Sequence, residues 1–158
     1  MGVDTDAAPV ESAQKQSVGM IVLPDSATED QIIGAIDCWI SLLESENYIV
    51  ACESVAAPPG GQWSAELIRS LIKDDWDDAP KDHRVTLAGI PRIPTHSGSG
   101  IHIQKKEVSR AKLLDGGEMK VVLYDLNIDG VASDLTALFS LVPVRDGLLL
   151  QLGDIRVM

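Results

Sequence analysis

The most unusual local composition in the chain is a run of carboxylates around a tryptophan, and it would suit recognition of a basic partner. Asp74, Asp75, Asp77 and Asp78 flank Trp76. A tryptophan anchor ringed by acidic groups is typical of a docking site for a basic protein. The alternative is a solvated loop whose Trp76 packs into the core. The run lacks the ligand register of a calcium loop. We name residues 74–78 the acidic loop and take it as the candidate partner-binding site.

A second group of residues could do acid–base chemistry. Tyr124, Asp125 and Asp134 lie near one predicted hairpin, and His102 lies in another predicted strand. A tyrosine donor and a carboxylate could stabilise an oxyanion and act as base. Tyr124 and Asp125 must point to opposite faces, because strand side chains alternate. The alternative is that both aspartates sit in water and His102 is only solvated or hydrogen-bonded. The catalytic residues, if any, stay undefined.

Metal and cofactor chemistry finds no support in the sequence. The two cysteines, Cys38 and Cys52, have no zinc-like spacing to histidine, and we expect both to be buried thiols in helices. The glycines around Ser99 carry no phosphate-binding fingerprint. We therefore expect no metal and no cofactor.

Composition narrows the classes of partner. The chain has 158 residues, of which 45% are hydrophobic, so one ordinary domain with a sizeable core is expected. Its net charge of -11 argues against binding nucleic acid or anionic lipid, both of which need a basic face. The same charge suits a basic protein partner through long-range attraction, although it can also serve solubility alone.

Residues 1–17 are polar and acidic, which predicts a disordered tail before a single domain at 18–158. The tail has neither the basic nor the apolar region of a signal peptide. The sequence contains no apolar run long enough for a membrane span. We expect a cytoplasmic location.

Helical periodicity dominates the first half. Residues 18–23 form a short apolar run that predicts an edge strand or a packed arm. Apolar residues at helical spacing, Trp39 among them, predict a helix over 27–45, with a capping box between Ser26 and Glu29. A second helix is expected at 48–57.

The second helix should begin at Asn47 as its cap and turn Ile49 and Cys52 inward. A third short helix should follow, capped by Ser64, with Ile68 and Ile72 in its apolar stripe.

From about residue 84 the period changes to that of strands. Strand-like runs cover 84–88, 101–109, 119–126, 131–142 and 148–157. Turn signals at Asp129-Gly130 and at Asp146-Gly147 make the last three an antiparallel meander. Several of these strands are apolar on both faces, so the second face should be covered by the N-terminal segment or by a second subunit.

Two segments together resemble the NTF2-like (SnoaL-like, cystatin-like) superfamily. They are AIDCWISLLESENYIVACE at 35–53, a helix with a central tryptophan, and the final strand LLLQLGDIRVM at 148–158. The resemblance implies an α+β cone, in which N-terminal helices pack in a curved antiparallel sheet around a pocket. It also implies homodimerisation through the outer sheet face. Members include isomerases, dehydratases and non-catalytic binding modules, so fold does not choose the function.

Two functions remain. The first is a non-catalytic interaction protein, for example an acidic bacterial immunity protein that binds a basic toxin. The acidic loop and the lack of a convincing catalytic set favour it. The second is a small-molecule enzyme that uses an inward carboxylate or histidine in the cone pocket. A cone interior filled by large side chains would count against the enzyme.

Overall fold

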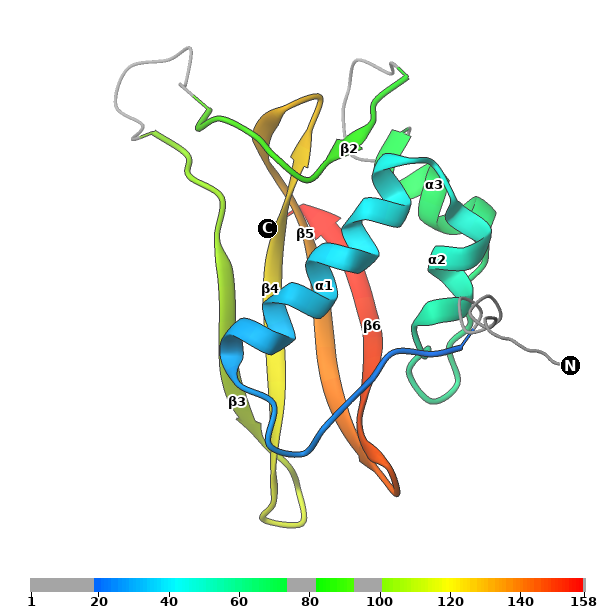
Figure 1. Ribbon diagram of the computed structural model, residues 1–158, viewed down its shortest axis with the longest axis vertical. Helices are drawn as coiled ribbons and strands as arrows, with labels where there is room; N and C mark the ends of the chain where they lie inside the picture. Colours follow the sequence, from blue (N-terminus) through cyan, green and yellow to red (C-terminus); the bar gives the residue numbers. More distant parts are fainter. Residues whose placement is uncertain (1–18, 74–81, 93–100, 158) are drawn as a thin grey trace, which may run out of the picture.

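The computed structural model describes residues 19–73, 82–92 and 101–157, and in this part of the chain three helices pack against one face of a curled antiparallel sheet (Figure 1). The sheet has six strands and forms a half-barrel, so the predicted α+β fold with helices in a curved sheet is confirmed. The elements, in chain order, are β1 (Val22–Leu23), α1 (Glu29–Glu44), α2 (Tyr48–Ser54), α3 (Ala65–Lys73), β2 (Val85–Thr86), β3 (Lys106–Lys112), β4 (Glu118–Ile128), β5 (Val131–Val144) and β6 (Gly147–Val157).

Helix α1 lies where periodicity places it, but its cap differs from the prediction. The Thr28 hydroxyl accepts the Gln31 N–H at 3.2 Å, and the Gln31 side chain accepts the Thr28 N–H at 2.8 Å. The expected cap at Ser26 is wrong, because the Ala27 N–H bonds to the Pro24 carbonyl and places Ser26 inside a turn. The cap therefore lies two residues later than predicted, at Thr28, and it forms the same type of capping box.

The second helix is shorter than predicted and turns a different side inward. It ends at Ser54, and Asn47 makes no capping hydrogen bond with its side chain. Ile49 is 66% exposed instead of buried, and Tyr48 and Ala51 face the core in its place. In α3 the predicted cap is confirmed, since Ser64 Oγ accepts the Leu67 N–H at 3.0 Å.

The cysteines also depart from the expectation that both are buried. Cys38 is exposed and Cys52 is half-buried. Cys38 lies on α1 next to Trp39, which is fully buried, so the apolar neighbour occupies the core-facing side of the helix and the thiol does not. In the described residues, no helix is both long and apolar enough to span a bilayer.

The strand order is β1-β6-β5-β4-β2, with β3 also paired to β4. Asp129 and Gly130 have φ values of 55° and 81°, so they form the tight turn that their sequence predicts between β4 and β5. The predicted start of β3 at Ile101 is wrong, because this strand begins at Lys106. His102 pairs instead with Arg92 in an antiparallel bridge, which draws residues 101–105 away from a regular strand.

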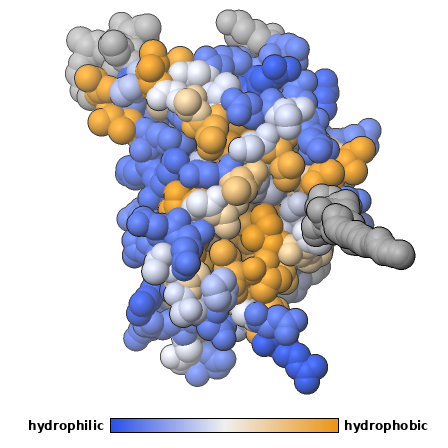
Figure 2. All heavy atoms as spheres, in the orientation of Figure 1, coloured by the Kyte–Doolittle hydropathy of each residue, from blue (hydrophilic) through white to orange (hydrophobic). Residues whose placement is uncertain are grey.

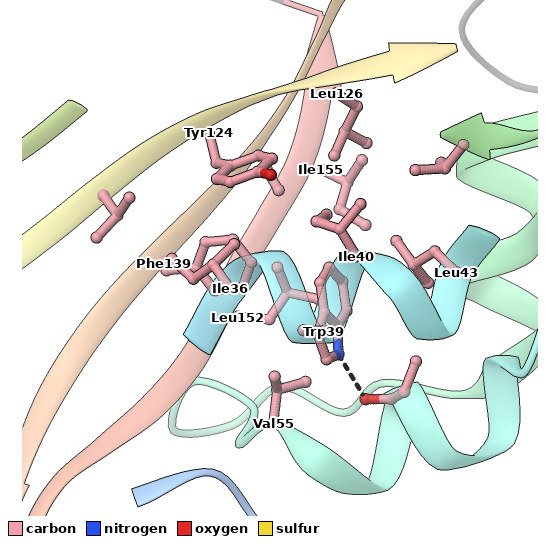
Figure 3. Packing of buried hydrophobic residues seen from close by; sticks show 14 of the residues in the cluster. Ile36, Trp39, Ile40, Leu43, Val55, Tyr124, Leu126, Phe139, Leu152 and Ile155 are labelled. Carbon is pink, nitrogen blue, oxygen red and sulfur yellow. Dashed lines mark hydrogen bonds between the residues drawn. The ribbon is translucent and has the colours of Figure 1, made fainter. Parts of the chain in front are cut away.

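Side chains fill the interior between the helices and the sheet. Trp39 of α1 packs edge-to-face on Phe139 of β5, with ring centroids 5.4 Å apart, and donates its indole N–H to the Ala51 carbonyl at 2.8 Å (Figure 3). Leu43 and Leu152 close the same space and are fully buried. The space between the helices and the sheet is thus a packed hydrophobic core with Trp39 at its centre.

Candidate functional site

The acidic loop, residues 74–78, lies outside the described residues, but both of its flanks are described. Lys73 is the last residue of α3, and the whole residue is only 3% exposed. Its Nζ lies 2.6 Å from Asp82 Oδ1 and 2.8 Å from Glu46 Oε2, and it donates to the His83 carbonyl at 2.8 Å. The two chain positions that border the segment 74–81 are therefore joined by a buried ammonium.

The charges of this lysine cluster stabilise one another. Burial lowers the pKa of Lys73, but hydrogen bonds to Asp82 and Glu46 outweigh it and leave the pKa above the ordinary lysine value. The same ammonium lowers the pKa of Glu46 and of Asp82 below their usual values. All three groups are thus held in their charged forms around neutral pH.

A pocket of about 510 Å³ opens on the face of the sheet opposite α1, and three of the predicted candidates line it. We call this face the outer face and the cavity the outer pocket. Leu123 and Asp125 of β4 and Thr136 of β5 form its floor. Its walls come from β5, from β3 and from the segment that leads into β3 (Ile101, His102, Ile103, Lys105, Glu107 and Asp134).

Asp125 is an anchor in this floor. It is 8% exposed, and its carboxylate accepts the Lys105 N–H at 2.9 Å and the Thr136 hydroxyl at 2.9 Å. Its backbone carbonyl accepts the Gln104 amide at 2.7 Å. These bonds hold the segment before β3 against β4, and each carboxylate oxygen already accepts one donor.

A β-bulge places His102 in the wall. The β4–β5 register shifts between Asp125 and Asn127, and Ser133 Oγ donates to the Leu126 carbonyl at 2.7 Å inside the shift. His102 Nε2 lies 2.9 Å from the Ser133 carbonyl, and because a carbonyl only accepts, Nε2 carries the proton. The lone pair of neutral imidazole is therefore on Nδ1.

Asp134 lies beside this imidazole. Its Oδ1 is 3.8 Å from His102 Nδ1 and accepts from Arg92 Nη2 at 2.6 Å. Asp125 Oδ2 lies 3.8 Å from His102 Nε2 on the other side. The three predicted residues His102, Asp125 and Asp134 thus meet in one open site.

Tyr124 does not join them. It points from β4 into the core toward α1, where it is fully buried (Figure 3). Its hydroxyl donates to Asp37 Oδ1. Lys106 Nζ lies 3.2 Å from the same oxygen and 5.0 Å from the centre of the tyrosine ring. Burial and the Asp37 carboxylate raise the pKa of Tyr124. Alternation of strand side chains predicts this opposite placement of Tyr124 and Asp125.

Sequence reasoning missed several residues of both sites. Lys105 and Thr136 line the outer pocket, and Arg92 bonds to Asp134 at its wall. Asp37 reaches Tyr124 from α1. No spacing along the chain signals these contacts, because each depends on how distant segments cross. Within the described ranges, no group of three or more His, Cys, Asp or Glu side chains could hold a metal ion.

The chain was also compared with known proteins. It matches no family, no curated protein and no solved structure. The curled sheet with its three described helices is compatible with a cone fold.

Proposed function

We propose that this chain is a non-catalytic binding protein of NTF2-like fold whose partner is a basic protein. The observation that carries the proposal is the filled interior of the cone. Trp39, Leu43 and Phe139 occupy the space where an enzyme of this fold would hold its substrate, and each is at most 2% exposed. A packed interior leaves binding to the surface.

Charge supports a basic partner. The net charge of -11 attracts cationic proteins over distance, and four of the negative charges lie in the acidic loop. Lys73 joins the flanks of that loop through Asp82 and the His83 carbonyl. Fixed flanks lower the conformational entropy that a binding loop loses on association. A bacterial immunity protein against a basic toxin is one concrete protein of this kind.

The alternative is a small-molecule enzyme with an inward carboxylate or histidine, and the geometry supports it less. His102 and Asp134 face the open outer pocket instead of the cone interior, and Asp125 is engaged by two donors. Tyr124 is fully buried, so no ligand reaches its hydroxyl.

A second copy of the chain is the proposed occupant of the middle of the outer sheet face. Val121, Leu123 and Leu138 line a shallow groove of about 390 Å³ there, together with Asp154 and Arg156. Asp154 and Arg156 put opposite charges side by side on this surface, 3.8 Å apart within one chain. A two-fold axis that passes between them would let each Arg156 face the Asp154 of the other copy. Homodimerisation would also cover the apolar outer residues that the sequence leaves on this face.

The test begins with light scattering on the purified chain and affinity capture from the source cell, followed by identification and purification of the captured protein. Its dissociation constant is then measured against salt concentration. We expect a basic protein whose affinity falls as salt rises. A chain that binds only small molecules, or a protein without basic character, would contradict the proposal.

A charge-matched pair of variants locates the interface. One variant replaces Asp74, Asp75, Asp77 and Asp78 with Asn. The control replaces four exposed acidic residues that lie elsewhere and make no ion pair among the described residues (Asp25, Glu53, Glu66 and Asp146, each to its amide). We expect the first to weaken binding much more than the second. Equal losses would assign the effect to net charge and remove the loop from the interface.

A further inference from the structure

We propose that the outer pocket is the seat for an arginine side chain of the basic partner. The inference rests on the proposed function and adds to it a specific point of contact. It is drawn from the hydrogen-bonding groups that the pocket offers, from its apolar rim and from its position at the end of the β4–β5 hairpin.

Several hydrogen-bond donors of the pocket residues are already bonded to protein acceptors. The Lys105 N–H and the Thr136 hydroxyl both donate to Asp125, and the His102 Nε2–H donates to the Ser133 carbonyl. A ligand that brings acceptors would find these three donors occupied, and of the lining groups it would meet only the Lys105 ammonium. A ligand that brings donors matches the site.

Three acceptors face the ligand. His102 Nδ1 lies 3.8 Å from Asp134 Oδ1, too far for a direct hydrogen bond, and it accepts no hydrogen bond among the described residues. Asp134 Oδ2 likewise has no partner in the described ranges, because Arg92 occupies Oδ1. The Glu107 carboxylate lines the same pocket and makes no ion pair within the described part of the chain.

A planar guanidinium is the side-chain group that best uses this arrangement. It carries five N–H donors in a fixed fork, so neighbouring donors of one group can reach an imidazole nitrogen and a carboxylate that lie side by side. The compact ammonium of lysine concentrates its charge at one point and lacks this fork.

The rim suits the aliphatic part of an arginine. Ile101 and Ile103 flank His102 and are 61% and 65% exposed, and Leu123 lies in the floor. Hydrophobic side chains gather at this corner of the molecule, beside the upper left grey segment of Figure 2. An arginine buries its methylene stem on such a surface while its charged head bonds to polar groups.

Two basic groups oppose a cationic ligand here. Arg92 is already paired with Asp134 Oδ1, so Lys105 provides the sharper control. Lys105 lines the pocket, and its ammonium makes no ion pair in the described ranges. Its removal must strengthen binding of a cationic ligand and weaken binding of an anionic one. The direction of change in a Lys105→Gln variant therefore identifies the charge of the ligand.

The test is an NMR titration of the full chain, in the oligomeric state that light scattering defines, with N-acetylarginine amide. N-acetylcitrulline amide is the control, because it has the same shape and no charge. We expect chemical shift changes confined to residues 101–107, 123–125 and 134–136 with the arginine compound and none with the citrulline compound. Shifts elsewhere, equal shifts with both compounds, or no shifts at millimolar ligand would overturn the proposal.

Variants supply the second measurement. Asp134→Asn and Glu107→Gln should each weaken arginine binding by about two- to fivefold, the range for exposed ion pairs. Lys105→Gln should strengthen it by a similar factor. Asp146→Asn removes one negative charge from the distant β5–β6 hairpin and should change nothing. If Asp146→Asn weakens arginine binding as much as Asp134→Asn does, the effect comes from net charge and the proposed arginine site is refuted.

The two proposals fail separately. Suppose the purified basic partner binds the chain but its affinity is unchanged in the Asp134→Asn and Glu107→Gln variants. The binding function then stands and the pocket is refuted. If no basic protein binds, the proposed function is refuted, while the arginine titration still decides whether the pocket recognises a guanidinium.

Discussion

The ammonium of Lys73 lies 2.6 Å from the Asp82 carboxylate, so the end of α3 is bonded to the first described residue beyond the acidic loop. The same ammonium bonds to Glu46, which stands in the α1–α2 turn with a φ of 59°. One buried cation therefore connects the helical layer to the strand that follows. Replacing Lys73 should lower the free energy of unfolding and change how that free energy depends on pH in the acid range.

Lys73→Met should destabilise the protein by about 2 kcal/mol, because the His83 carbonyl and two carboxylates lose their shared donor. Urea unfolding followed by circular dichroism measures the change. Lys112→Met is the matched control, since Lys112 is exposed at the end of β3, and it should change stability by less than about 0.5 kcal/mol. Equal stability of the two variants would show that the cluster is dispensable.

The acid dependence of stability should change as well. The folded pKa of Glu46 and of Asp82 lies below the ordinary values of 4.5 and 3.8, so their stabilisation is present above those values and is lost as pH falls through the folded ones. The advantage of the wild type over Lys73→Met should therefore be largest near neutral pH and shrink as pH falls below about 4.5. Urea midpoints measured across this range test it; a constant difference would contradict it.

Asp125→Asn should cost about 1–3 kcal/mol, because one of its two accepting oxygens becomes a donor that faces the Lys105 N–H or the Thr136 hydroxyl. Hydrogen exchange of the Lys105 amide should accelerate with it. Asp134→Asn is the comparison, since its ion pair with Arg92 is exposed and contributes less. A fully stable Asp125→Asn would show that the segment before β3 is held by other contacts.

Tyr124→Phe should cost about 1–2 kcal/mol through the lost bond to Asp37. Tyr48→Phe is an informative control, because the buried Tyr48 hydroxyl finds no hydrogen-bond partner among the residues that the structure describes, and its removal should be neutral or stabilising. Thermal unfolding of both variants measures the difference. A larger loss in Tyr48→Phe would reverse this assignment.

Gly147→Ala should cost about 3 kcal/mol and loosen β1, because a Cβ atom there would collide with the Leu23 carbonyl oxygen and φ is 144°. Gly116→Ala, at φ 90° with open space around it, separates conformational strain from collision and should cost about 1 kcal/mol. Chemical denaturation compares the two. Similar losses would mean that β1 moves aside without cost.

Local patterns predicted much of this fold because their causes are local. Helix α1 follows from apolar residues at helical spacing, and the β4–β5 turn follows from Asp129-Gly130, which tolerate positive φ. The predicted start of β3 and the predicted inward face of α2 were wrong. His102 pairs with Arg92 and Ile49 is exposed, and both outcomes depend on how distant segments pack.

The sequence by itself determined the order of helices and strands, the antiparallel meander, the opposite directions of Tyr124 and Asp125, and the acidic charge. Only the tertiary structure decided which face carries His102, Asp125 and Asp134, and that Lys73 bonds to both Glu46 and Asp82. The physical reason is that strand alternation fixes relative directions but not which face meets the helices. A bulge such as that at Ser133, and a crossing segment such as 101–105, arise from packing and leave no period in the chain.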